Sequence, residues 1–296
     1  MSGKTGKTVS GMGFSCVTYN IQYGVGMDGR YELERIADAV RDADLIAFQE
    51  VTRGMPVNGG ADMVAALQTL LPDHQGVFGS PFQIGLEALG GARGSFFEFG
   101  NMIFSKMPIL ATRSINLPRS RTYDQLNLQR CALEALVETP IGPVRFYSVH
   151  LDHVSSEERL AQIAYLQDIA DGHRQQGGAA TGLSAFGFPD LPIGDAYMLM
   201  GDFNLEPESA EYIALCGSSS SEFGRPRRSG VLADVTRPPG SAVSDVHTYF
   251  HPKGEVPSKR LDYCFASAEL APHCSEPRVD SDDVGSDHRP VWVTIS

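Results

Sequence analysis

Hydrophobic positions along the chain repeat with two different periods, and the two patterns alternate. Apolar, β-branched and aromatic runs typical of strands are separated by segments whose apolar residues recur every three or four positions, as on one face of a helix. In the first quarter this predicts strands at Phe14–Asn20 and Leu45–Phe48 and helices at Tyr31–Ala43 and Ala61–Leu71. Such alternation is typical of α/β proteins.

The rest of the chain continues this pattern with longer loops. Further strands are predicted at Met102–Phe104, Ala132–Glu138, Val144–His150, Tyr197–Met200, Leu261–Ala266 and Val291–Ile295, and helices at Glu157–His173 and Ser209–Cys216. Residues 76–100, 113–130, 175–195 and 218–230 are predicted loops, and long loops are often functional. Because strands recur from residue 14 to residue 295 without a linker, we expect one domain at residues 14–296 after a tail at residues 1–13.

Composition narrows the class of protein. With 42% hydrophobic residues, the 296-residue chain can bury a sizeable core and is not mostly disordered. Its net charge of -12 argues against broad, salt-driven binding of nucleic acid, although a local basic groove stays possible, and suits a protein that gathers divalent cations. No apolar run approaches the roughly 18 residues of a membrane span. Five cysteines without paired spacing, and no apolar signal segment, favour reduced thiols and a cytoplasmic location.

Polar residues cluster where apolar strands end, which is where α/β sheets build their sites. They are Asn20, Glu50, His150, Asp202, Asn204, Asp262, Asp287 and His288. Each has an ordinary structural interpretation by itself, such as a turn, a helix cap or an ion pair. Together they are ligands for hard cations and acid–base groups.

Six short segments, in this order, carry a resemblance to a known family. They are TYN (18–20), FQE (48–50), SVHLDH (148–153), GDFNLEP (201–207), KRLDY (259–263) and GSDHRPV (285–291). The set resembles the endonuclease/exonuclease/phosphatase superfamily over essentially the whole chain. The resemblance implies a DNase-like four-layer α/β/β/α sandwich, with two packed, mainly antiparallel sheets flanked by helices. It also implies a metal-dependent phosphoesterase site at the strand ends.

The resemblance implies a role for each of the metal and acid–base residues. Glu50 matches the principal Mg²⁺ ligand, with Asn20 beside it, and Mn²⁺ is an expected substitute for one or two ions. His288 matches the general base, and Asp287 either orients that base or helps to hold metal. Asp202 either orients the attacking water, holds a second metal or is itself the base. Asp262 either partners His288 or positions the water.

The remaining matched residues face the phosphate. The resemblance implies that Asn204, His150 and Arg130 bind phosphoryl oxygens. A histidine at position 150 is similar to the DNase-type and sphingomyelinase branches, where it can also protonate the leaving group. It therefore favours phosphodiester over phosphomonoester hydrolysis.

The substrate is predicted from charge and loops. The net charge favours a small-molecule or lipid-headgroup phosphodiester, with a DNA or RNA nuclease as the alternative and a non-catalytic binding protein as a remote one. The arginines at 113–121 and 225–228 are either solvated or bind an extra phosphate or a nucleic-acid strand. The loops at 76–100 and 174–195 are predicted to set specificity. Their phenylalanines, Phe96, Phe97, Phe99, Phe186 and Phe188, either reach a lipid chain or base or only pack the loops.

Overall fold

The computed structural model describes residues 13–220, 222, 224–225, 230–237 and 246–296. The predicted tail lies outside these residues except for Gly13, and so do Arg227 and Arg228 of the second arginine group. No helix in the described part of the chain is long and apolar enough to cross a membrane.

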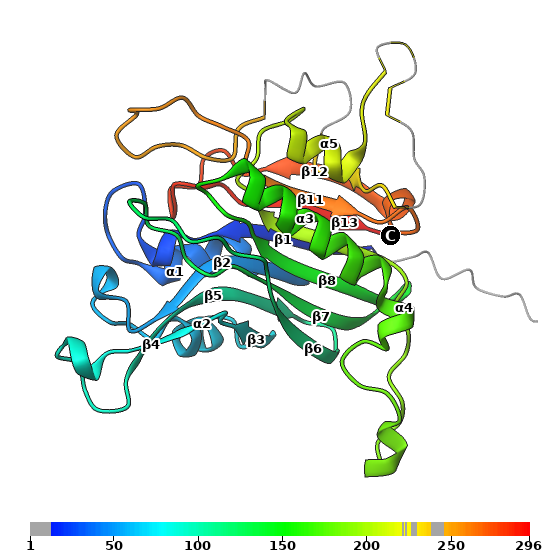
Figure 1. Ribbon diagram of the computed structural model, residues 1–296, viewed down its shortest axis with the longest axis horizontal. Helices are drawn as coiled ribbons and strands as arrows, with labels where there is room; N and C mark the ends of the chain where they lie inside the picture. Colours follow the sequence, from blue (N-terminus) through cyan, green and yellow to red (C-terminus); the bar gives the residue numbers. More distant parts are fainter. Residues whose placement is uncertain (1–12, 221, 223, 226–229, 238–245) are drawn as a thin grey trace, which may run out of the picture.

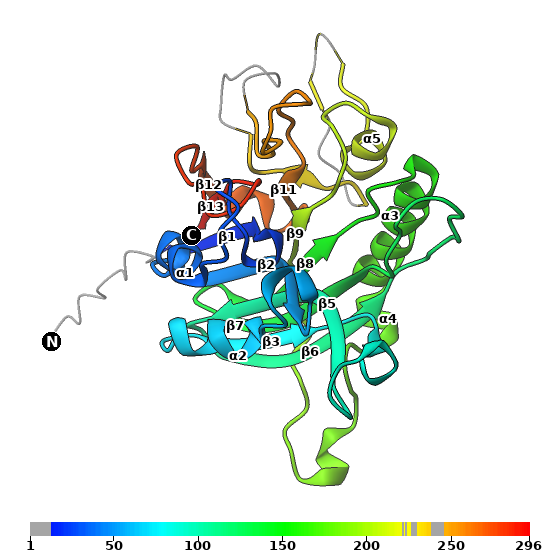
Figure 2. The same ribbon diagram turned by 90° about the vertical axis from the view of Figure 1, so that its left-hand side faces the viewer.

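Two sheets lie face to face at the centre of the molecule (Figure 1, Figure 2). The first has the order β12-β13-β1-β2-β5-β3, with β4 paired to β5, and the second has the order β10-β11-β9-β8-β7-β6. The strands of the first sheet are β1 (Phe14–Asn20), β2 (Leu45–Arg53), β3 (Gln75–Gly79), β4 (Gln83–Gly85), β5 (Phe96–Ser105), β12 (Cys274–Val279) and β13 (Val291–Ile295). Those of the second are β6 (Ile109–Asn116), β7 (Cys131–Thr139), β8 (Gly142–His150), β9 (Tyr197–Asp202), β10 (Ala233–Asp234) and β11 (Asp262–Ala266).

Helices cover the outer faces of the two sheets. The helices α1 (Leu33–Val40) and α2 (Met63–Leu70) pack on the first sheet, and α3 (Ser156–Asp171) and α5 (Ala210–Cys216) pack on the second. A short helix, α4 (His173–Gln176), follows α3. The pairs β1–β2 and β8–β9 run parallel, whereas the other strand pairs of the described chain are antiparallel. The predicted α/β/β/α sandwich is confirmed.

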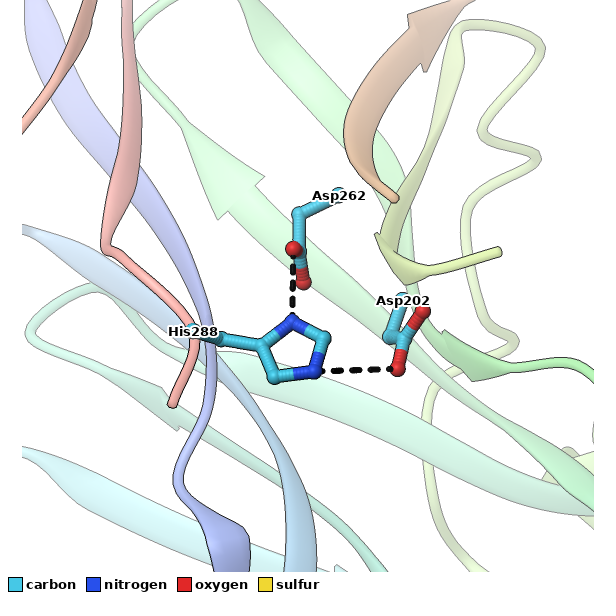
Figure 3. Close-up of side chains that lie close together, drawn as sticks. All are labelled: Asp202, Asp262 and His288. Atoms are coloured by element: carbon cyan, nitrogen blue, oxygen red, sulfur yellow. Dashed lines mark hydrogen bonds and ion pairs between the residues drawn. The ribbon is translucent and has the colours of Figure 1, made fainter. Parts of the chain in front are cut away.

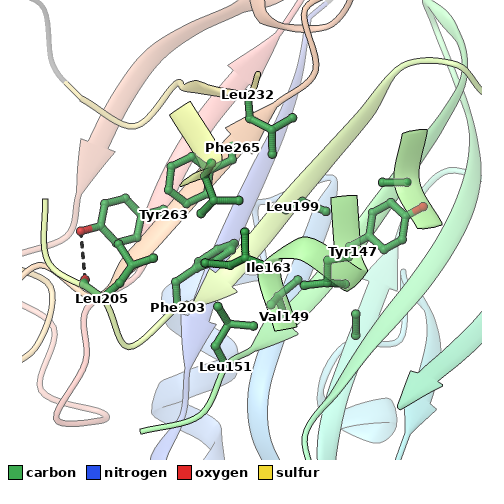
Figure 4. Close-up of a cluster of buried hydrophobic side chains, with 14 of the residues drawn as sticks. Tyr147, Val149, Leu151, Ile163, Leu199, Phe203, Leu205, Leu232, Tyr263 and Phe265 are labelled. Carbon is green, nitrogen blue, oxygen red and sulfur yellow. Dashed lines mark hydrogen bonds between the residues drawn. The ribbon is translucent and has the colours of Figure 1, made fainter. Parts of the chain in front are cut away.

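Three hydrophobic clusters hold the layers together. Side chains alternate along β1, so that Cys16 faces the second sheet while Val17 and Tyr19 face α1. Both faces of the strand are therefore buried, in keeping with its β-branched and aromatic side chains. On the outer face of the second sheet, Ile163 of α3 packs into a cluster that includes Phe203 and residues of β8 and β9 (Figure 4).

The predicted loops at 76–100 and 113–130 are wrong in part. The first contains β3, β4 and the start of β5, and the second contains the end of β6. Glycines obscured the strand pattern where strands approach closely: a Cβ at Gly100 would lie 2.1 Å from the carbonyl oxygen of Gly79. Both β6 and the unpredicted β12 are edge strands; β12 is largely polar and β6 is mostly polar in its second half, which is how natural sheets protect their edges.

Candidate active site

The polar residues predicted at strand ends meet at one end of the sandwich. Two parallel pairs bring their strand ends level, because His150 of β8 lies opposite Asp202 of β9 and Asn20 of β1 lies opposite Gln49 of β2. The antiparallel strand β11 starts at the same place and sets Asp262 beside Asp202. These ends border a cavity of about 960 Å³. Seven predicted site residues line it: Glu50, Arg130, His150, Asp202, Asn204, Asp287 and His288.

His288 lies between two carboxylates (Figure 3). Its Nδ1 is 2.8 Å from Oδ2 of the fully buried Asp262, and its Nε2 is 3.7 Å from Oδ2 of Asp202. Burial alone would lower the pKa of His288, but the carboxylates of Asp262 and Asp202 more than offset this and raise the pKa well above its usual range. The geometry thus pairs Asp262 with the imidazole and leaves Nε2 on the cavity side.

Asn20 connects two of the carboxylates. Its Nδ2 donates to Oε1 of Glu50 at 3.2 Å and to Oδ2 of Asp202 at 3.0 Å, and its side-chain carbonyl oxygen, Oδ1, accepts from the backbone N–H of Gln22. Gln22 in turn donates from Nε2 to Oδ2 of Asp287 at 3.0 Å. Sequence reasoning missed Gln22, because only the turn after β1 brings this ordinary glutamine back to the site.

Strained backbone marks the same place. Glu50 and Asn204 have φ values of 62° and 50°, and Gln22 and Tyr23 have values of 41° and 43°. Non-glycine residues seldom adopt these left-handed conformations unless the surrounding structure holds them there. At Glu50 the cause is a bulge in β2 between Phe48 and Val51, which turns the carboxylate out of the strand alternation and into the cavity.

Arg130, His150 and Asn204 also line the cavity. Arg130 is 5% exposed, and its Nη2 lies 2.9 Å from Nδ1 of His153, whereas its Nε and Nη1 have no hydrogen-bond partner among the described residues. His150 Nε2 lies 3.5 Å from Oδ2 of Asp202, and burial, with Arg130, lowers the pKa of His150 well below its usual value. Asn204 donates to the carbonyl oxygen of Leu151 at 3.1 Å.

The donor set fits a hard divalent cation. Burial and the nearby carboxylate of Asp287 raise the pKa of Glu50 to about 7, and burial also raises that of Asp287. Carboxylates gathered out of water repel one another unless a cation or protons neutralise them. The two carboxylates and the Asn20 carbonyl, which keeps a second lone pair, are oxygen ligands of the kind that Mg²⁺ prefers. Carboxylate and imidazole atoms of Asp202, Asp262 and His288, within 4.8 Å of one another, form a second possible cluster.

The predicted specificity loop at 174–195 is not at this site. It includes most of α4 and, with His173, lines smaller cavities at the opposite ends of β8 and β9. Figure 1 shows it projecting there. Phe186, 81% exposed, therefore cannot contact a substrate in the active-site cavity. Glycine content identified an unusual loop but could not tell which end of the sheet it follows.

The other predicted specificity loop does reach the cavity. Phe97 and Phe99, which alternation places on one face of β5, line it. The described arginines of the groups at 113–121 and 225–228 do not line it. Among the described members, Arg113 pairs with Glu134 at 2.6 Å, Arg119 donates to the carbonyl oxygen of Asn127, Arg121 lies over the Tyr123 ring and Arg225 pairs with Glu208.

Comparison with known proteins identifies the family. The structure is similar to an endonuclease/exonuclease/phosphatase from Beutenbergia cavernae (21% identity, 96% of this chain and 71% of that chain, TM-score 0.61). It is also similar to a mannosyl-6-phosphatase from Bacteroides thetaiotaomicron (17%, 96% and 100%, 0.58) and to truncated TDP2 from Caenorhabditis elegans (17%, 96% and 97%, 0.58). A search of curated proteins gives no match. The model of the Endonuclease/Exonuclease/phosphatase family matches residues 17–288, and the chain therefore belongs to this family.

Proposed function

We propose that this protein is a Mg²⁺- or Mn²⁺-dependent phosphodiesterase that hydrolyses a small-molecule or lipid-headgroup phosphodiester. Members of its family are hydrolases of phosphoesters and generally depend on divalent metals. One observation carries the proposal: His288 lies between Asp262 and Asp202, beside the carboxylates of Glu50 and Asp287 and at the wall of one cavity. A proposed base, a set of oxygen ligands and a cavity of about 960 Å³ thus lie together.

The proposed base is His288. Its Nδ1–H donates to Asp262, which fixes the tautomer and leaves the Nε2 lone pair to take a proton from the attacking water. Asp202, 3.7 Å from that nitrogen, accepts a hydrogen bond from the same water and orients it. The imidazolium that results lies between two carboxylates, which stabilise its charge.

Glu50, Asn20 and Asp287 are the proposed metal ligands. When bound, the ion polarises the phosphoryl oxygens, neutralises charge on the leaving oxygen and offsets the carboxylates that hold a proton on His288. Asn20 keeps Glu50 in place through its hydrogen bond, and Gln22 does the same for Asp287. Arg130, His150 and Asn204, which line the same cavity, bind the phosphoryl oxygens.

A hydrolysis panel tests this function. Purified protein with Mg²⁺ or Mn²⁺ is assayed on bis(p-nitrophenyl) phosphate, p-nitrophenyl phosphate, p-nitrophenyl phosphorylcholine, and single- and double-stranded DNA and RNA. We expect turnover of the small diesters, loss of turnover in EDTA and recovery with added metal. A preference for the monoester would contradict diester chemistry, and degradation of nucleic acid would make the protein a nuclease. Binding without turnover in any metal would support the non-catalytic alternative. The cytoplasmic location stays a prediction from the sequence.

A further inference from the structure

The loop between β6 and β7, residues 117–130, buries Asn127 and Arg130 but leaves Leu126 exposed and Leu128 half-buried. Buried Glu158 of α3 accepts hydrogen bonds from the Ser120 N–H at 2.6 Å and from Asn127 Nδ2 at 3.5 Å. Leu126, next to the buried Asn127, is 71% exposed. Hydrogen bonds to the buried Glu158 hold the loop in this conformation. The exposure of Leu126 is therefore a feature of an ordered loop.

These leucines border the active-site cavity. Leu126 and Leu128 line it, together with Phe97 of β5, Val154 before α3 and Val256 of the loop before β11. Four segments of the chain thus supply apolar side chains to the lining of this cavity. Exposed apolar residues that converge on a pocket mark a binding surface.

The charges around the same cavity are suited to one phosphoryl group. Three arginine or lysine side chains line it, and two of them are already paired: Arg159 with Glu211 at 2.8 Å and Lys259 with Glu206 at 2.9 Å. Arg130 is the one whose guanidinium forms no ion pair within the described residues. A polynucleotide or a polyphosphate needs several unpaired cations along its path, and the described residues of this cleft do not supply them.

We propose that the cleft binds a phosphodiester that carries a single phosphoryl group and an apolar alkyl or aryl arm, with that arm lying against Leu126, Leu128 and Phe97. This inference rests on the proposed function and names the substrate class of the same site. A sugar or nucleotide arm is disfavoured, because its hydroxyl and amide groups would lose water against these side chains without gaining hydrogen bonds.

A homologous series of substrates measures the apolar contact. p-Nitrophenyl alkyl phosphates from methyl to hexyl share one leaving group and differ only in the alkyl arm. If the arm is buried, kcat/KM with Mn²⁺ rises by about fourfold for each methylene that enters the cleft, up to the length that the wall can cover. A flat or falling series, with turnover still present, would overturn the inference and leave the proposed function standing. No turnover of any phosphoester would overturn the proposed function itself.

A pair of variants locates the contact. The double variant Leu126→Asn, Leu128→Asn should lower the hexyl-to-methyl ratio of kcat/KM by about tenfold, since two apolar contacts are lost. Tyr123→Ser is the matched control: Tyr123 belongs to the same loop, is 83% exposed and does not line the cavity, so this variant should keep the wild-type ratio. An unchanged ratio in the double variant, or an equal loss in the control, would place the apolar arm elsewhere and refute the proposed subsite.

Discussion

Buried polar side chains gather at both ends of β8 and β9, but a buried arginine has a hydrogen-bond acceptor for each of its nitrogens at only one end. At the far end, Arg145 donates to the carbonyl oxygens of Gly194 and Asp195 and to the Tyr147 hydroxyl. At the active-site end, Arg130 is equally buried, yet Nε and Nη1 have no partner within the described chain. A buried arginine with unused donors is costly unless a ligand supplies the acceptors.

The carboxylates differ in the same way. At the far end Glu134 pairs with Arg113, and Asp171 accepts from the Tyr197 hydroxyl at 2.7 Å. At the active-site end Glu50 lies near Asp287, and burial together with repulsion from that carboxylate raises the pKa of Glu50. The comparison teaches that polarity and burial do not distinguish a site from a structural cluster. Unbalanced charge and unused donors do, because the ligand has to complete them.

The sharpest test of this contrast exchanges one histidine at each end for alanine. His288→Ala should lower kcat by about 10³-fold, the usual range for loss of a general base. His173, buried at the far end with an Nδ1 that has no hydrogen-bond partner among the described residues, most resembles a site residue there. We expect His173→Ala to keep kcat, measured on bis(p-nitrophenyl) phosphate. Undiminished kcat in His288→Ala would refute the base assignment, and a large loss in His173→Ala would break the contrast between the ends.

Replacing each of the two buried arginines by methionine should affect a different property, activity for Arg130 and stability for Arg145. Arg130→Met should lower kcat/KM by about 10²-fold, since charge-assisted hydrogen bonds to the phosphoryl group are lost, with no fall in Tm. Arg145→Met should leave kcat of the folded protein unchanged but lower the free energy of unfolding by about 3 kcal/mol, because three acceptors, two of them buried, lose their donor. Activity assays and urea unfolding separate the two effects. The reverse pattern would show that Arg130 is structural.

How much was predictable from the sequence depends on how far each feature relies on tertiary structure. Strand-end positions such as Asn20, Glu50 and His288 were predicted to converge, and the structure brings them together, although their roles stay predictions. Gln22 was not predicted, because a left-handed turn carries it to Asp287. The edge strand β12 was missed because its sequence is largely polar and lacks the apolar alternation that indicates a strand. Polar residues on an edge strand prevent pairing with other chains.

Replacing His153, the hydrogen-bond partner of Arg130, should give a smaller effect that depends on the charge of the new side chain. His153 accepts from Arg130 through Nδ1, and burial and Arg130 lower the pKa of His153, so the acceptor is neutral and leaves the arginine charge uncompensated. His153→Asn keeps a neutral acceptor and should stay within about threefold of wild-type kcat/KM. His153→Asp would neutralise Arg130 and should lose about tenfold, with weaker competitive inhibition by inorganic phosphate. Equal activity of the two variants would show that the charge of the acceptor is irrelevant.

The smallest effect should appear in the stability of the far end. Burial would raise the pKa of Glu134, but hydrogen bonds from Arg113 and Tyr147 more than offset this and lower it. A carboxyl whose pKa is lowered by folding stabilises the protein above its unfolded-state pKa of roughly 4.5, and this contribution is lost as the pH falls through the folded-state pKa. Glu134→Gln should therefore unfold about 1 kcal/mol more easily than wild type at pH 7, with the difference shrinking below about pH 4.5. Glu138→Gln, exposed on the same strand, should show no such dependence in urea unfolding. If the difference in the free energy of unfolding between Glu134→Gln and wild type stays constant down to pH 3, the pair of Glu134 with Arg113 does not stabilise the protein through its charge.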